Sequence, residues 1–99
     1  MAYRILVSPR AQKEIENAID YYALNSTVAS RKFIASVATA YQILSEVPFF
    51  TVRYKDIRSF KIKYFPYSLY FVVYEERKVV RVLSCFHNKR NPDKRPKNG

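Results

Sequence analysis

The spacing of the apolar residues changes once along this chain, after Pro48, and this change restricts the possible folds strongly. Between residues 9 and 24 apolar side chains recur at the spacing of an amphipathic helix. Ser8 and Pro9 mark its start, because serine caps a helix and proline is tolerated in the first turn. A second helical stripe consists of Phe33 or Ile34, Val37, Tyr41 and Leu44. With a short strand over residues 3–7, the first half predicts a strand followed by a helical hairpin.

From Ile57 onward apolar and polar residues alternate, which is typical of a strand with one buried face. The polar positions are Ser59, Lys61 and Lys63, and the apolar positions are Phe60, Ile62 and Tyr64. After a turn at residues 65–68, two apolar strands are predicted over 69–74 and 79–86. The resulting order is β-α-α-β-β-β. We therefore expect an α+β fold, a twisted and mainly antiparallel sheet of about four strands with the helical hairpin packed on one face.

Length and composition exclude several classes of protein. Ninety-nine residues suffice for one core, so we expect a single domain over residues 1–99, with 88–99 as a basic tail. The only glycine is Gly99, which excludes glycine-rich phosphate loops. One cysteine and one histidine cannot form a Cys/His zinc site, so no metal and no cofactor is expected. No apolar run reaches the roughly 20 residues of a membrane span, and no secretory signal is recognisable, so cytoplasmic location without membrane contact is expected.

Positive charge is concentrated in the C-terminal half. Residues 1–52 carry five Lys or Arg against four Asp or Glu, whereas residues 53–99 carry thirteen against four. This half therefore accounts for nine of the ten net positive charges. Such asymmetry indicates a polyanionic partner, which could be a nucleic acid, an acidic protein segment or an anionic membrane surface.

The predicted order of elements, the "FPYSLYFVVY" strand and the "HNKRNP" ending together resemble the RelE/ParE family of toxins from bacterial type II toxin-antitoxin systems. The resemblance covers nearly the whole chain and is closest to the ParE-like, plasmid stabilisation branch. It implies a growth inhibitor that a cognate acidic antitoxin neutralises. The implied target is DNA gyrase in the ParE branch, and ribosome-bound mRNA, which is cleaved, in the RelE branch.

The enzymatic alternative, a ribosome-dependent mRNA interferase, depends on four residues. Lys61-Ile62-Lys63 is similar to the strand with which RelE-type nucleases hold the scissile phosphate, and strand alternation would send both ammonium groups to one face. His87 would transfer the proton, and Arg90 would add charge at the phosphate. Ser68 stands where those nucleases carry an arginine, and no glutamate stands near the lysines. Both departures favour a ParE-like inhibitor that docks without cleaving a bond.

For such an inhibitor, the same half of the chain supplies the candidate contacts with target or antitoxin. They are Arg53, Arg58, Lys61, Lys63, Tyr67, Arg81, His87, Lys89 and Arg90. An antitoxin segment would place its carboxylates on Arg53, Arg58 and Arg81. A further alternative is a basic nucleic-acid-binding module outside any toxin system. Cys85, on an apolar strand, is expected to be a buried small hydrophobic residue.

Overall fold

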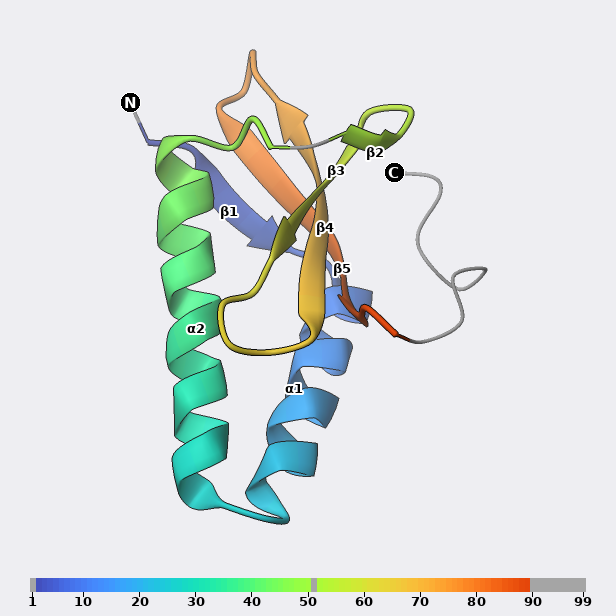
Figure 1. Ribbon diagram of the computed structural model, residues 1–99. Helices are drawn as coiled ribbons and strands as arrows, with labels where there is room; N and C mark the ends of the chain where they lie inside the picture. Colours follow the sequence, from blue (N-terminus) through green and yellow to red (C-terminus); the bar gives the residue numbers. More distant parts are fainter. Residues whose placement is uncertain (1, 51, 90–99) are drawn as a thin grey trace.

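The computed structural model describes residues 2–50 and 52–89, and Figure 1 shows how its helices and strands are arranged. Their order along the chain is β1 (Arg4–Val7), α1 (Pro9–Ala23), α2 (Thr27–Glu46), β2 (Val52–Tyr54), β3 (Ile57–Lys61), β4 (Tyr67–Tyr74) and β5 (Val79–His87). The predicted α+β fold with a helical hairpin on a mainly antiparallel sheet is confirmed.

The sheet has five strands rather than about four, in the spatial order β1-β5-β4-β3-β2. The additional strand is β2, whose three residues are all exposed, so it shows no alternation of buried and exposed positions. β1 pairs with β5 in parallel, and the other neighbours pair antiparallel. This parallel pair brings the first residues of the chain next to residues 79–82.

The third strand is shorter than its sequence pattern indicates. Alternation continues to Tyr64, but β3 ends at Lys61. Tyr64 has a φ of 73°, in the left-handed region, which a residue within a strand does not adopt. The expected turn at residues 65–68 is also displaced, because β4 already begins at Tyr67. Lys63 therefore lies in the turn between β3 and β4 and not on a strand.

Both helices begin at serine caps. The Ser8 hydroxyl accepts a hydrogen bond from the Ala11 N–H at 3.1 Å, and Pro9 occupies the first turn of α1. The Ser26 hydroxyl accepts from the Ala29 N–H at 3.2 Å and starts α2 in the same way. Neither helix among the described residues is long and apolar enough to cross a bilayer.

The sheet has buried apolar residues on both faces. The larger cluster lies between the hairpin and the sheet, and strands β4 and β5 contribute Tyr67, Leu69, Phe71, Val80, Val82 and Cys85 to it. A second cluster consists of Ile57, Tyr70, Val72, Leu83 and Phe86, and neither helix contributes to it. We call the side of the sheet that carries the second cluster the open face.

Candidate functional site

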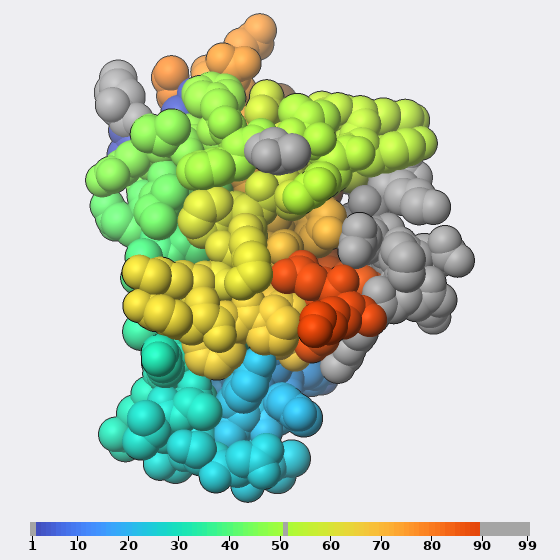
Figure 2. Space-filling model, viewed as in Figure 1, coloured from blue at the N-terminus to red at the C-terminus, as the bar shows by residue number. Residues whose placement is uncertain are grey.

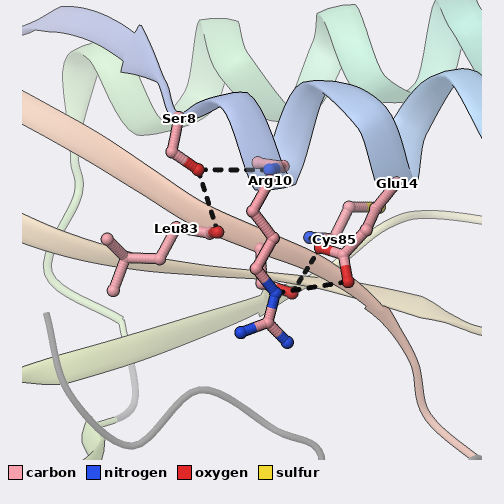
Figure 3. Close-up of polar contacts among 7 residues, drawn as sticks. Ser8, Arg10, Glu14, Leu83 and Cys85 are labelled. Carbon is pink, nitrogen blue, oxygen red and sulfur yellow. Dashed lines mark hydrogen bonds and ion pairs between the residues drawn. The ribbon is translucent and has the colours of Figure 1, made fainter.

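A β-bulge in β5 fixes the position of helix α1. Tyr70 pairs with Ser84 but Phe71 pairs with Val82, so Leu83 is the extra residue. Two side chains of the α1 region bond to backbone groups on this stretch of β5, as Figure 3 shows. The Ser8 hydroxyl donates to the Leu83 carbonyl at 2.9 Å. One oxygen of Glu14 accepts from the Cys85 N–H at 3.0 Å and from the Ser84 hydroxyl at 2.7 Å.

The same contacts keep Cys85 unreactive. The residue is 2% exposed, and burial, with a smaller contribution from the Glu14 carboxylate, raises the pKa of its thiol to about 12. A thiol with this pKa is protonated at neutral pH and is a poor nucleophile. The predicted role of Cys85 as a buried hydrophobic residue is therefore confirmed.

A small cleft lies where α1 meets the ends of β4 and β5. Its volume is about 90 Å³, and its lining residues are Glu14, Asn17, Ala18, Tyr21, Tyr67, Cys85, Phe86 and His87. A second hollow, of about 280 Å³, adjoins it and is lined by Tyr21, Tyr22, Pro66, Tyr67 and His87. Pockets for small ligands usually measure about 300–1,000 Å³, so the first cleft is too small for a nucleotide. The first cleft has room for little more than the end of one side chain.

His87 lies at the edge of this cleft, on the helix side of the sheet. Its ring packs edge-on against Tyr67, with 5.1 Å between the centroids. The Lys89 N–H donates to His87 Nδ1 at 3.1 Å, so Nδ1 is an acceptor in this arrangement. The carboxylate among the residues that line the cleft with His87 is that of Glu14 on α1, and none of these residues is on β3.

Lys61 and Lys63 do not form the pair that the sequence predicts. Lys61 lies opposite Ser68, which lies opposite Phe86 of the open face, so Lys61 and His87 are on opposite faces. The Lys61 ammonium donates to the Phe65 carbonyl at 3.1 Å and to the Ile62 carbonyl at 3.4 Å. The Lys61 side chain therefore bridges the turn between β3 and β4.

Lys63 takes part in a different contact, outside the strand. Its ammonium lies 5.0 Å from the centroid of the Tyr64 ring, and the Lys32 ammonium of α2 lies 4.3 Å from the same ring. Two cations therefore flank one exposed aromatic side chain. The expectation that Lys61 and Lys63 share one strand face is wrong, because β3 ends between them.

The turn and the end of β5 nevertheless adjoin each other. In the space-filling view the turn (yellow) and the end of β5 (red) lie side by side above the tip of the hairpin (Figure 2). The Asn88 N–H donates to the Pro66 carbonyl at 2.8 Å, and Ser68 and Asn88 are bonded through their side chains, also at 2.8 Å. Lys61 and the end of β5 thus both adjoin the turn between β3 and β4, but Lys61 and His87 lie on opposite faces of the sheet.

The three arginines expected to meet antitoxin carboxylates are in separate places. Arg53 on β2 donates to the Ser59 hydroxyl at 2.8 Å. Arg58 on β3 donates to the Phe50 carbonyl at 2.8 Å and lies 5.5 Å from the Phe49 ring. Arg81 is on β5, two strands away from β3 in the sheet. The structure thus places the three arginines on three different strands, and Arg53 and Arg58 already have partners within the chain.

The remaining candidates differ in accessibility. Tyr67 is only 6% exposed, because its ring packs against Tyr22 and Phe33 in the core. Its contact with the His87 ring therefore lies on the buried side of that ring. Lys89 is exposed at the end of β5. Arg90 and the predicted tail lie outside the described residues, apart from Asn88 and Lys89.

Sequence reasoning missed Glu14, Arg4 and Arg77. Glu14 is one of several charged residues on α1 and does not stand out in the sequence, although its carboxylate bonds to β5. Arg4 and Arg77 line a groove with Arg81, which only the parallel pairing of β1 and β5 reveals. No group of three or more potential metal ligands is found among the described residues.

Comparison with protein families and with solved structures indicates one family. The family described as the ParE toxin of the type II toxin-antitoxin system parDE matches residues 5–92. No curated protein matches the sequence. A structure of the chromosomal ParDE system of P. aeruginosa has a TM-score of 0.73 at 15% identity, covering 87% of this chain and 96% of that chain.

Two RelE-type structures are also similar. The RelBE2 toxin-antitoxin complex of Mycobacterium tuberculosis has a TM-score of 0.63 at 18% identity, covering 88% of this chain and 92% of that chain. A free RelE toxin of E. coli, carrying two arginine-to-alanine substitutions, has a TM-score of 0.63 at 20% identity, covering 90% and 86%. These likenesses establish the shared fold, and the family match extends over most of the sequence. The chain belongs to the ParE toxin family of type II toxin-antitoxin systems.

Proposed function

We propose that this toxin stops growth by docking on a cellular target, with DNA gyrase as the expected target, and that it cleaves no bond. The observation that carries the proposal is the separation of the candidate catalytic groups. Cleavage of RNA by its own 2'-hydroxyl needs proton transfer and positive charge at the same phosphate. Lys61 bridges a turn, Lys63 lies beside Tyr64, and His87 is on the opposite face of the sheet from Lys61.

We further propose that a cognate acidic antitoxin neutralises the toxin. Toxin-antitoxin complexes are among the similar structures. The net charge of +10 supports an acidic partner, since complementary charge speeds association and disfavours wrong partners. The antitoxin and the target are separate partners and can use separate surfaces.

The second candidate is a ribosome-dependent mRNA interferase. It is supported by the contact between the turn and the end of β5, because the Asn88–Pro66 hydrogen bond joins the residue after His87 to the turn that Lys61 bridges. This mechanism requires the bound ribosome to rearrange the turn so that both side chains reach one phosphate. Catalytic groups often come into place only in the complex.

The test compares the wild type with the double variant Lys61→Ala, Lys63→Ala after induction in cells. For a docking inhibitor, messages stay full length in both strains. For an interferase, the wild type cleaves messages and the double variant does not. Circular dichroism of both purified proteins shows whether the loss of the Lys61 bridge has disturbed the fold, and the pair Lys13→Ala, Arg31→Ala controls for the loss of two exposed cations on the helices.

A further inference from the structure

A groove of about 450 Å³ runs along the open face at the β1 end of the sheet. It is lined by Arg4, Leu6, Tyr74, Arg77, Val79 and Arg81. Ile5 and Val7 pack against the core beneath the helices, so the alternating Arg4 and Leu6 point to the open face. Arg4 lies opposite Val79, and Leu6 lies opposite Arg81, so β1 and β5 contribute one cation and one apolar residue each.

The groove combines an apolar floor with three arginines, of which Arg77 also lines an adjoining hollow with Glu75 and Glu76. Leu6 is 44% exposed and Tyr74 is 38% exposed. Within the described residues, no hydrogen bond or ion pair is found for the guanidinium groups of Arg4, Arg77 and Arg81. Glu75 and Glu76 belong to the adjoining turn but do not line this groove. The three positive charges around one hollow repel one another. An anionic partner in the hollow would be attracted to all three and would offset this repulsion.

The groove also borders an unpaired strand edge. β1 is the last strand of the sheet on this side. The Arg4 N–H donates to the carbonyl of Lys78, the residue before β5, at 2.8 Å, and the Ser8 N–H donates to the Val82 carbonyl at 2.9 Å. The intervening Ile5 and Val7 therefore direct their backbone groups to the outer edge. No hydrogen bond to these outer groups is found in the described part of the chain. An edge of this kind can pair with a strand from another protein.

We propose that this edge and groove bind an extended, glutamate-rich segment of a partner protein, which adds to the sheet as a strand beside β1. Glutamates at alternate positions would face the open side, where their carboxylates meet Arg4, Arg77 and Arg81 and their aliphatic stems cover Leu6. Apolar residues at the other positions would extend the packing of Ile5 and Val7. The inference rests on the proposed function in one respect, namely that the antitoxin is the partner supplying the segment.

The observations favour a peptide over a nucleic acid. Proteins that bind single-stranded nucleic acid usually stack several bases on aromatic side chains, whereas Tyr74 is the one aromatic residue that lines this groove. The remaining floor is aliphatic, and unpaired backbone groups at a strand edge match another strand. An oligonucleotide therefore serves as the competing ligand in the test.

The test measures binding of a synthetic peptide of alternating valine and glutamate to the purified full chain. A peptide of the same composition with its glutamates in one block is the ligand control. NMR amide shifts locate the bound peptide, and fluorescence anisotropy gives its affinity. We expect shifts at Ile5, Leu6 and Val7, and preference for the alternating peptide.

Charge-reversal variants test the arginines. Arg4→Glu with Arg81→Glu should weaken binding about tenfold or more, because attraction is replaced by repulsion at two positions. Lys13→Glu with Arg31→Glu changes the net charge equally at exposed helical positions and should weaken binding less than about twofold. Arg77→Glu, at an exposed turn residue, is a second groove variant should the first pair fail to fold.

Three results would overturn the inference. They are an equal loss of affinity in both double variants, amide shifts away from β1, and tighter binding of a single-stranded oligonucleotide at the same residues. Toxicity is measured separately. A toxic chain that does not bind the peptide refutes this inference alone, whereas a chain that binds it without inhibiting growth refutes only the proposed function.

Discussion

Replacing Glu14 with alanine should destabilise the fold more than its position on a partly polar helix indicates. The carboxylate accepts two hydrogen bonds from β5 on one oxygen, from Ser84 and from the backbone of Cys85. Cys85 is 2% exposed, so water would replace the lost acceptor of its N–H only in part after the substitution. The Ser84 hydroxyl can rotate to another acceptor, but the N–H cannot.

The magnitude follows from these two contacts. An unsatisfied buried N–H costs about 1–3 kcal/mol, and hydrogen bonds to a charged group contribute about 1.5–3 kcal/mol each. The Glu14 side chain is 26% exposed, so water partly replaces it, and we expect a loss of about 2–3 kcal/mol in the free energy of unfolding. For a domain of this size that corresponds to a fall in Tm of about 8–24 °C. Glu14→Gln keeps an acceptor oxygen and should cost about 1 kcal/mol.

Thermal and urea unfolding of the two variants, followed by circular dichroism, measure these losses. Glu16→Ala is the matched control, since this glutamate is exposed on the same helix and should change stability by less than about 0.5 kcal/mol. Equal stability of Glu14→Ala and Glu16→Ala would refute the assignment of Glu14 as the contact that joins α1 to the bulge.

Four further tests, two of them substitutions, probe the packing. Ser8→Ala removes a helix cap and the bond to Leu83, and should lower the free energy of unfolding by about 2 kcal/mol in urea titration; an unchanged midpoint would contradict this role. Tyr41 has a buried hydroxyl without a partner among the described residues, so Tyr41→Phe should raise stability by about 1 kcal/mol, and a lower Tm would count against it. Burial raises the pKa of Tyr41 from its ordinary value of 10.0 to about 12, so the wild type should lose stability as pH rises from 10 to 12, and the phenylalanine variant should lose less. Cys85 should resist alkylation at pH 8 until urea unfolds the chain, as mass spectrometry would show, and rapid labelling of the folded protein would contradict its burial.

Local signals predicted the helices and the main strands well. Ser8 and Pro9 start α1 as expected, and the apolar run of β4 is central in the sheet. The alternation of apolar and polar residues predicted too long a third strand. It continues to Tyr64, but the backbone of Tyr64 has a left-handed conformation that does not belong to a strand. β2 gave no signal, since three exposed residues contain no buried face to detect.

The candidate site depended on information that no local pattern contains. Whether Lys61 and His87 share a face is decided by the register of two strand pairs and by the extra residue at Leu83. The grouping of Arg4 with Arg81 requires two segments over 70 residues apart to pair in parallel. Sequence reasoning identified the basic half correctly, but the division of its cations among separate surfaces follows from the sheet order.

The central claim is that this toxin inhibits growth without cleaving RNA, and mapping of mRNA 5' ends after induction tests it most directly. We predict full-length messages in cells that have stopped growing, together with induction of an SOS reporter, as expected when DNA gyrase is the target. New 5' ends within ribosome-bound messages, present with the wild type and absent with Lys61→Ala, Lys63→Ala, would contradict the claim.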